Sequence, residues 1–323
     1  MKILVTGGTG LVGKSLQDIL KTDSICTHEF IFVSSKDANL MIKEEVDKLF
    51  KNEKYDAIIH LAASVGGLYK NMSDNVNMYF ENMTMNINII KACHENNVNR
   101  GIFCLSSCIY PANPSEFPMT ESMLHEGSPH DSNKGYAHAK RQLEIMCEMY
   151  SVNYQRRYIC VSPVNLYGPH DNYNIENGHV LSSVMHRMYN SLKSQEFSMY
   201  GTGKALRQFL FAPDFAKAIL KLLFDDSVKF GVYNICTIID LWNPYEPMRE
   251  YMIKDVIYMI AYNLNFPKEK IKMDVSKSDG IIKKTVTGLK FIKKYPGFKF
   301  TPLSEGLKIT IKWMIDNYDS IRK

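Results

Sequence analysis

The chain has 323 residues, a length that suggests two lobes at about 150 residues per domain, although one large α/β unit is also allowed. Hydrophobic residues make up 45% and charged residues 23% of the chain, ordinary values that argue against a disordered or fibrous protein. The formal net charge of +5 is mildly basic and is not gathered into one stripe, which argues against a binder of extended nucleic acid.

The first half of the chain alternates short β-branched runs with helical patterns. Strands are predicted at residues 2–6, 30–33, 57–61, 101–105 and 158–161, and helices at 11–20, 43–52, 77–97 and 136–150. Strands that alternate with helices of this length indicate right-handed crossovers. The fold class is therefore predicted as α/β, with a doubly wound parallel sheet of the Rossmann type.

After about residue 170 this alternation ends. Helices are predicted at 179–191, 255–263 and 304–319, the last with Ser304 as its N-cap, while 211–224 and 232–236 are assigned back to the sheet domain. The predicted division is a nucleotide-binding domain at 1–170, to which 205–237 returns, and a smaller C-terminal α/β substrate lobe. That lobe comprises 171–204 and 238–323.

Cysteine content and apolar runs indicate the compartment. The seven cysteines are an odd number without a Cys-x-x-Cys pair, which predicts reduced thiols in a cytoplasmic protein and no metal site. No apolar run nears the roughly 20 residues that span a bilayer, so no membrane association is expected. The basic stretch Lys283–Lys299 is interpreted as a solvated face, with a polyanion groove or a small phosphorylated ligand as alternatives.

A glycine-rich turn, Thr6–Gly13, follows the first predicted strand and opens a helix. Glycines at 7, 10 and 13 permit a tight turn, close approach of a pyrophosphate and close helix–strand packing, and the helix N-terminus offers free N–H groups to phosphates. A turn without a ligand is the alternative. The candidate cofactor-binding residues are Gly7, Gly8, Thr9, Gly10, Leu11, Val12 and Gly13.

The end of the second predicted strand indicates which dinucleotide is bound. NAD-binding proteins usually carry Asp or Glu about 20 residues after the glycine turn, where it binds the ribose hydroxyls. Here the strand ends in Ser34, Ser35 and Lys36, which can hydrogen-bond and neutralise a 2′-phosphate. NADP(H) is therefore favoured, and the alternative is that Lys36 faces solvent while Asp37 takes the ribose role.

Tyr136 and Lys140 form a second motif. Their spacing of four places both on one face of a helix, which follows a strand that ends at Ser106. A phenol with a pKa of about 10 is a poor acid–base group at neutral pH, and an adjacent ammonium is expected to lower that pKa. Ser106 is expected to hold a carbonyl or hydroxyl oxygen beside the phenol. The set suits hydride transfer between a nicotinamide and a C–OH or C=O centre.

These motifs resemble the extended short-chain dehydrogenases/reductases and, within them, the family of GDP-L-fucose synthases. The resemblance runs across nearly the whole chain, and its most specific strings are Ser-Ser-Cys-Ile-Tyr-Pro at 106–111 and Gly-Pro-His-Asp-Asn-Tyr-Asn-Ile-Glu-Asn-Gly-His-Val at 168–180. It implies a bifunctional enzyme that converts GDP-4-keto-6-deoxy-D-mannose to GDP-L-fucose by epimerisation at C3 and C5 and NADPH-dependent reduction at C4.

The resemblance also implies roles for individual residues. Cys108 and His179 match the family's acid–base pair for epimerisation, and Ser106 and Tyr136 would stabilise the developing oxyanion. Arg187, Tyr200, Arg207 and Asp279 match positions that bind the GDP part of the substrate. Further residues match cofactor contacts: Leu61, Lys140, Pro163, Asn165, Leu166 and His179.

A homodimer is expected from the resemblance alone. The segment 237–251 departs from the family, because it is bulkier and more aromatic than the acidic turn expected there, and it is interpreted as a surface loop or a subunit contact. The alternatives for function are another NAD(P)-dependent nucleotide-sugar 4-reductase or epimerase, and a catalytically silent NADP-binding scaffold. A dehydratase is disfavoured because Ser107 and Cys108 stand where dehydratases place an Asp-Glu pair.

Overall fold

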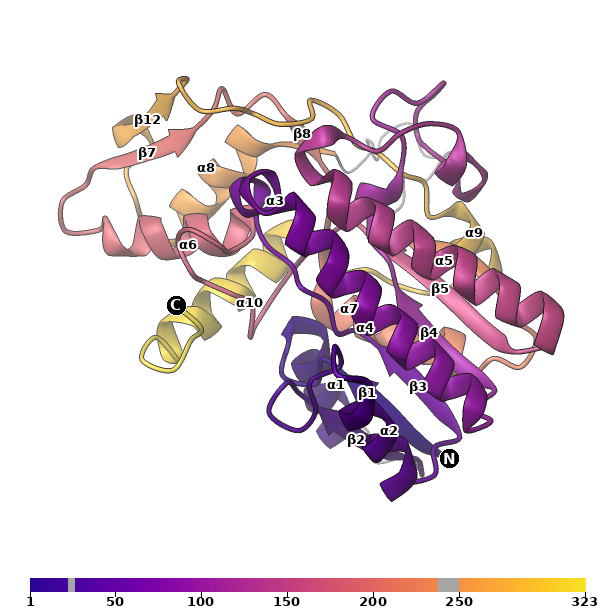
Figure 1. Cartoon of the computed structure of the whole chain (residues 1–323). Helices are drawn as coiled ribbons and strands as arrows, with labels where there is room; N and C mark the ends of the chain where they lie inside the picture. The colour runs from indigo at the N-terminus through magenta and orange to yellow at the C-terminus, as the bar shows by residue number, and fades with distance from the viewer. Residues whose placement is uncertain (23–26, 238–249) are drawn as a thin grey trace.

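A computed structural model describes residues 1–22, 27–237 and 250–323 (Figure 1). At its centre is a six-stranded sheet in which all strands are parallel, in the order β10-β5-β4-β3-β1-β2. The predicted fold class is therefore confirmed. The strands are β1 (Lys2–Thr6), β2 (Glu29–Val33), β3 (Ala57–His60), β4 (Arg100–Cys104), β5 (Arg157–Pro163) and β10 (Gly231–Ile235).

Helices cover both faces of the sheet. α4 (Asn75–Glu95) and α5 (Lys134–Tyr154) pack together on one face, and α1 (Leu11–Thr22) and α7 (Ala212–Phe224) pack together on the other (Figure 1). α2 (Lys43–Asn52) connects β2 to β3. Because β2 and β3 lie on opposite sides of β1, the chain reverses direction across the sheet there, and ligands of such sheets bind at this crevice.

A second group of elements forms its own hydrophobic cluster, which includes Met185, Ile260 and Leu307. Its helices are α6 (Val180–Asn190), α8 (Ile253–Asn263) and α10 (Leu303–Asp316). Three short strand pairs accompany them: β7 (Phe197–Tyr200) with β12 (Ile271–Asp274), β8 (Leu206–Arg207) with β11 (Tyr251–Met252), and β6 (Asn165–Tyr167) with β9 (Phe209–Phe211). Two short helices, α3 (Leu68–Ser73) and α9 (Leu289–Lys294), complete the described α-helices.

The start of the last helix differs from the prediction. Its first residue is Leu303 and the residue before it is Pro302, so Ser304 is not the N-cap. Ser304 lies inside the first turn, where its own backbone N–H is among the donors that lack an intrahelical partner. The predicted loop at 237–251 lies, for residues 238–249, outside the described residues.

The segment 281–287 brings the C-terminal part of the chain back against the sheet domain. The Leu206 N–H donates to the Ile282 carbonyl at 2.8 Å, and the Met119 N–H donates to the Thr285 carbonyl at 2.8 Å. Gln208 and Val286 exchange two hydrogen bonds at 2.9 and 3.0 Å. Val286, together with Phe291 of α9, belongs to the hydrophobic core of the sheet domain, although residues 238–323 were predicted for the substrate lobe.

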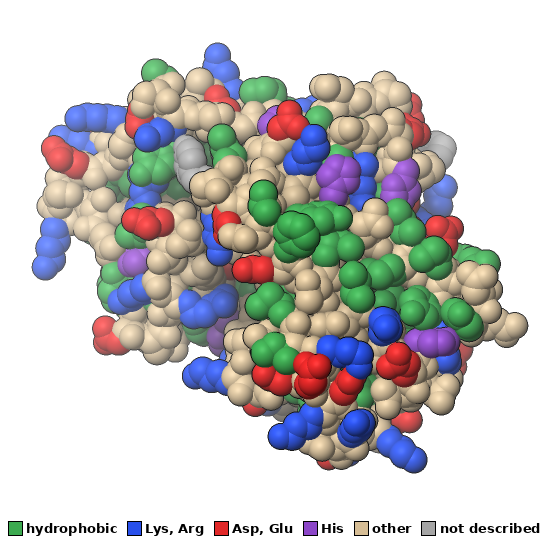
Figure 2. All heavy atoms as spheres, in the orientation of Figure 1, with side chains coloured by type: hydrophobic (Ala, Val, Ile, Leu, Met, Phe, Trp, Pro, Cys, Tyr) green, Lys and Arg blue, Asp and Glu red, His purple; other side chains and the backbone are tan. Residues whose placement is uncertain are grey.

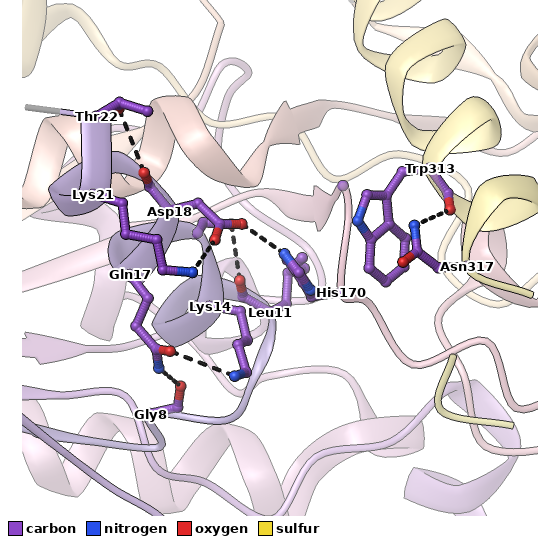
Figure 3. A network of polar contacts seen from close by, with 12 residues as sticks. Gly8, Leu11, Lys14, Gln17, Asp18, Lys21, Thr22, His170, Trp313 and Asn317 are labelled. Carbon is purple, nitrogen blue, oxygen red and sulfur yellow. Dashed lines mark hydrogen bonds and ion pairs between the residues drawn. The ribbon is translucent and has the colours of Figure 1, made fainter. Parts of the chain in front are cut away.

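His170 connects α1 to the C-terminal helix (Figure 3). Its Nε2 lies 2.7 Å from Oδ2 of Asp18 on α1, and its ring packs against Trp313 of α10 with the centroids 4.5 Å apart. Arg322 donates to its carbonyl at 3.1 Å. His170 therefore makes a structural contact between the two groups of elements. Among the described residues, no helix combines the length and apolar character needed to cross a bilayer.

Candidate active site

The glycine turn between β1 and α1 is too tight for side chains at its key positions. Gly7 has φ +73°, and a Cβ there would lie 2.8 Å from the Ala62 backbone nitrogen. A Cβ on Gly13 would lie 2.5 Å from the Gly7 oxygen and 2.6 Å from the Gly8 oxygen. Helix α1 therefore begins directly against the turn, and its N-terminal N–H groups face the crevice at which a pyrophosphate binds. The turn fits a dinucleotide.

The end of β2 presents hydroxyl and ammonium groups. The Asp37 carboxylate is engaged by Ser34, three residues before it: its Oδ2 accepts hydrogen bonds from the backbone N–H and the hydroxyl of Ser34, both at 2.7 Å. These hydrogen bonds lower the pKa of Asp37. Ser35 and Lys36 are exposed beside it. An ammonium and a hydroxyl suit a 2′-phosphate, and the alternative ribose role of Asp37 has to compete with its bonds to Ser34.

Four further predicted cofactor contacts follow the carboxyl ends of strands. The Leu61 N–H, just after β3, donates to the Thr6 carbonyl at 3.2 Å. Pro163 ends β5, and Asn165 and Leu166 begin the short β6. Asn165 is held in place because its Nδ2 donates to the Gln208 carbonyl at 2.8 Å. These residues lie where parallel sheets bind their ligands, and their role as cofactor contacts stays a prediction.

The end of β4 and the start of α5 bring the predicted catalytic residues together. Ser106 follows β4, and its hydroxyl accepts a hydrogen bond from the Cys108 N–H at 3.2 Å. Lys140 is almost completely buried, and its Nζ donates to the Cys104 carbonyl at 2.7 Å. The same Nζ lies 5.9 Å from the centroid of the Tyr136 ring. Tyr136 in turn interacts electrostatically with Cys104 and Cys108.

The expected lowering of the Tyr136 pKa is wrong for this structure. Burial, with smaller contributions from Cys104 and Cys108, raises the pKa of Tyr136 well above its ordinary value. Burial also lowers the pKa of Lys140, whose Nζ is engaged by a backbone carbonyl. The prediction counted the ammonium charge but not the cost of removing the phenolate from water. Tyr136 is therefore held as the neutral phenol, the form that can donate a proton.

Cys108 differs from the cysteines around it. Burial tends to raise the pKa of its thiol, but the Lys284 ammonium, the Ser106 hydrogen bond and the Arg207 charge together lower that pKa below its ordinary value. The Lys284 Nζ lies 3.5 Å from the Cys108 Sγ. In contrast, burial raises the pKa of Cys104 to about 11 and that of Cys236 to about 12. The thiolate form is thus more favoured at Cys108 than at Cys104 or Cys236.

His179 lies at the start of α6. It is exposed, and it precedes the first residue of α6 as the N-cap. Its charge acts on Asp171, whose pKa is raised overall because the carboxyl is buried. The contacts of the described residues bring Lys284, rather than His179, against the Cys108 thiol. The pairing of Cys108 with His179 across the substrate stays a prediction.

The four predicted GDP-binding residues fall into two groups. The Arg187 guanidinium lies over the Tyr200 ring, 4.2 Å from its centroid. Arg207 interacts electrostatically with Asp279 and with Cys108. Asp279 holds the turn after β7, because its carboxylate accepts from the Thr202 N–H at 2.8 Å and the Thr202 hydroxyl at 2.7 Å. Arginine and aromatic side chains are suitable for a nucleoside diphosphate, and Asp279 orders the loop between them.

Comparison with known proteins places this geometry in a family. Residues 3–236 match the model of the NAD dependent epimerase/dehydratase family. The chain belongs to this family.

Relatives within this family cover the whole chain. The chain is 38% identical to the GDP-L-fucose synthase of Dictyostelium discoideum over 332 residues, 99% of this chain and 97% of the relative. It is 37% identical to the probable GDP-L-fucose synthase of Drosophila melanogaster, over 100% and 99% of the two chains. The crystal structure of a GDP-L-fucose synthetase from Naegleria fowleri bound to NADP has a TM-score of 0.89 and 36% identity, over 100% and 96%. The resemblance inferred from the sequence is confirmed.

Two cations in this member of the epimerase/dehydratase family were not identified from the sequence. Lys14 lies on the first turns of α1, and its Nζ donates to Gln17 Oε1 at 3.4 Å, while Gln17 Nε2 donates to the Gly8 carbonyl at 2.7 Å (Figure 3). Lys14 thus adds positive charge beside the glycine turn. Its position directly after Gly13 in the sequence could have identified it as a candidate residue of the cofactor site. Lys284, against Cys108, had no comparable local signal.

A buried polar chain also joins the glycine turn of this family member to its α5 helix. The Thr6 hydroxyl lies 2.8 Å from His60 Nδ1, and His60 Nε2 lies 3.1 Å from Asn86 Oδ1. Asn86 Nδ2 donates to the Ala139 carbonyl, beside Lys140, at 3.3 Å. Burial, assisted by the charge of Lys140, lowers the pKa of His60 to about 3, so the ring is neutral. The chain fixes α5 relative to β1.

Proposed function

We propose that the protein is an NADP-dependent oxidoreductase with epimerase activity that converts GDP-4-keto-6-deoxy-D-mannose to GDP-L-fucose. The observation that carries this proposal is the similarity, over essentially the full length, to proteins named GDP-L-fucose synthase. The site supports it independently, because a neutral phenol and an ionisable thiol lie in electrostatic contact at the end of β4.

NADP(H) is the proposed cofactor, and when bound it supplies the hydride for the C4 ketone. The relative from Naegleria fowleri binds NADP, and the glycine turn of this chain fits a pyrophosphate. Lys14 adds charge at that turn, and Ser35 and Lys36 would hold the 2′-phosphate. Leu61, Pro163, Asn165 and Leu166, with Lys140 and His179, would contact the rest of the cofactor.

In the epimerisation half-reaction, the Cys108 thiolate would take a proton from the carbon next to the C4 ketone. The electron pair of that C–H bond moves onto the ketone oxygen, where the Ser106 hydroxyl and the Tyr136 phenol would stabilise it. His179 would return a proton on the opposite face of the sugar. Cys108 suits the first role because its pKa is lowered, whereas the pKa of neighbouring Cys104 is raised.

In the reduction half-reaction, Tyr136 would donate its proton to the C4 oxygen. The raised pKa of Tyr136 keeps the phenol protonated at neutral pH, which is the form that this step consumes. Lys140 lies close to the ring and is fixed by the Cys104 carbonyl, so it would limit the charge cost as the phenol gives up its proton.

The substrate partner is a GDP-sugar, bound through Arg187, Tyr200 and Arg207, with Asp279 ordering the loop after β7. The Arg187 guanidinium carbon lies 4.2 Å from the centroid of the Tyr200 ring, so the pair offers a cation beside an aromatic ring. Arg207 extends this positive charge toward Cys108. The diphosphate would therefore lie between the two arginines, with the sugar directed to the thiol.

A homodimer in the cytoplasm is also part of the proposal. Figure 2 shows hydrophobic side chains gathered over α4 and α5. They include the exposed residues Val76, Phe80, Ile87, Met149 and Val152. Apolar surface of this kind favours a protein partner, and the proposed partner is a second copy of the chain. Light scattering should give twice the chain mass, and Phe80→Glu combined with Val152→Glu should give the single mass; a native monomer would contradict the homodimer.

The deciding experiment for the activity combines the protein with GDP-4-keto-6-deoxy-D-mannose and NADPH and identifies the sugar that forms. GDP-L-fucose with stoichiometric NADPH oxidation supports the proposal. A 6-deoxy sugar with unchanged C3 and C5 would leave only a nucleotide-sugar 4-reductase. Tight NADPH binding without turnover would instead favour the scaffold alternative.

A further inference from the structure

The contact between Lys284 and Cys108 joins residues that are 176 positions apart in the chain, at a Nζ–Sγ distance of 3.5 Å. We propose that Lys284 is a positioning residue for epimerisation: its ammonium group pairs with the Cys108 thiolate and holds that group ionised and aimed before the substrate binds. The catalytic consequence rests on the proposed function, but the Lys284–Cys108 ion pair is a property of the free protein.

The backbone on both sides of Lys284 is fixed. On one side, the Ile282 carbonyl accepts from the Leu206 N–H at 2.8 Å. On the other side, the Thr285 carbonyl accepts from the Met119 N–H at 2.8 Å, and Thr285 is buried. A lysine on an anchored backbone loses less conformational freedom when its ammonium is held in one place. The fold thus holds the Lys284 ammonium at the thiol. A lysine that only faced solvent would not be fixed in this way.

The other groups that face Cys108 do not replace this cation. Ser106 contributes a hydroxyl, and Tyr136 on α5 is a neutral phenol whose pKa is raised. Arg207 on β8 is charged, but it divides its interaction between Cys108 and Asp279, and its Nη1 donates to the Leu206 carbonyl at 2.8 Å. Among the residues that the structure describes, Lys284 is the cation in hydrogen-bond contact with the thiol.

The pair prepares a simple proton transfer. The thiolate takes a proton from the substrate carbon, so the C–H bond breaks, the S–H bond forms and the electron pair moves to the ketone oxygen. No oxidant or reductant is consumed. A thiolate is a base only in its deprotonated form, so a neighbouring ammonium increases the fraction of enzyme that is ready to react.

The test measures the ionisation of Cys108 directly in the substrate-free protein. The protein is treated with iodoacetamide over a range of pH, and the alkylation rate of the peptide that contains Cys108 is followed by mass spectrometry, because only the thiolate reacts. In Lys284→Met the rate at pH 7 should fall about ten-fold and the pH profile should shift to higher pH. Lys284→Gln is the second neutral variant if the first does not fold, and Lys284→Arg should retain most of the native rate.

Lys283→Met is the matched control. Lys283 carries the same charge one residue earlier, but its Nζ lies 3.6 Å from Glu250 and 4.9 Å from the centre of the Phe117 ring. Its removal should leave Cys108 alkylation unchanged. If Lys284→Met and Lys283→Met alter the Cys108 profile equally, or neither alters it, the proposed pair is refuted, whatever reaction the enzyme catalyses.

The catalytic consequence is read from deuterium exchange at C3 and C5 in heavy water. Lys284→Met should slow the exchange and shift its pH profile to higher pH, in parallel with the alkylation profile. If Lys284 only bound substrate phosphate, the KM for the GDP-sugar would rise while the alkylation profile stayed native, which overturns the proposal. If native protein shows no exchange at all, the proposed epimerase activity fails, while the alkylation result still decides the ion pair.

Discussion

Replacement of Gly13 by alanine tests the cofactor turn with a single methyl group. The added Cβ would lie 2.5 Å from the Gly7 oxygen, 2.6 Å from the Gly8 oxygen and 2.7 Å from the Gly8 carbonyl carbon. An ordinary non-bonded contact is roughly 3.5 Å, so the turn must retreat by about 1 Å. These neighbours are backbone atoms, and no rotamer change can relieve the contact.

The expected effect on binding is larger than the effect on stability. Overpacking of this kind destabilises the folded protein by about 1–3 kcal/mol. Alanine offsets about 1 kcal/mol of this loss because it favours the helix more than glycine does. In the free protein the turn can relax away from α1, so the melting temperature should fall only slightly. NADPH binding requires the original conformation of the turn, so the binding free energy becomes about 2 kcal/mol less favourable. The Kd for NADPH should therefore rise about 30-fold.

Fluorescence titration of NADPH, together with thermal melting, measures both effects. Gly297→Ala is the control, because a Cβ at Gly297 meets nothing within 4 Å. The control should bind NADPH with native affinity. If Gly13→Ala also binds with native affinity while it remains folded, the cofactor does not depend on this turn, and the assignment of the Rossmann crevice as the NADPH site is refuted.

Three other substitutions have defined outcomes. Tyr136→Phe should leave NADPH binding nearly intact and reduce turnover by about 10²–10⁴-fold, since it removes the proton donor, and unchanged NADPH oxidation would exclude that role. Cys108→Ala should abolish deuterium incorporation at C3 and C5, and incorporation at the native rate would show that another base acts. The third substitution is at His60, whose pKa falls from 6.5 to about 3 on folding. Between these two pH values the unfolded chain binds more protons than the folded chain. The free energy of unfolding therefore decreases as the pH falls below 6.5. The slope approaches about 1.4 kcal/mol per pH unit, and denaturant titrations of His60→Gln should lack this contribution; an identical pH dependence in variant and native protein would contradict a buried neutral His60.

Local pattern was sufficient to predict the sheet and its helices. The five predicted strands are bounded within two residues of their prediction, because buried parallel strands are continuous apolar runs such as Ile3, Leu4 and Val5, all fully buried. The sixth, β10, falls on the segment 232–236 that was assigned to the sheet domain. The short pairs such as β6 with β9 were not identified. Each has only a few residues, and its pairing depends on contacts between distant segments rather than on a period in the sequence.

The candidate site was predictable in its residues but only partly in its electrostatics. The helical spacing correctly places Lys140 near the Tyr136 ring. It does not show that the Lys140 Nζ bonds to the Cys104 carbonyl or that burial dominates the phenol, and the predicted direction of the Tyr136 pKa is therefore wrong. The basic run Lys283–Lys299 was interpreted as a solvated face, yet Lys284 points to Cys108, because alternate residues of an extended segment face opposite sides.

Residues 281–287 return to the sheet domain. As a result, the groups assigned to ketone reduction and those assigned to epimerisation do not all come from the same part of the chain. The phenol, Lys140 and the glycine turn all lie within residues 3–236, the portion that matches the general epimerase/dehydratase model, whereas the ammonium beside the thiol comes from a segment beyond it. Replacing Lys284 in the intact chain would keep every group assigned to hydride transfer and remove the cation that faces Cys108. Substitution at this one position is thus a route to separate ketone reduction from stereochemical inversion on one scaffold.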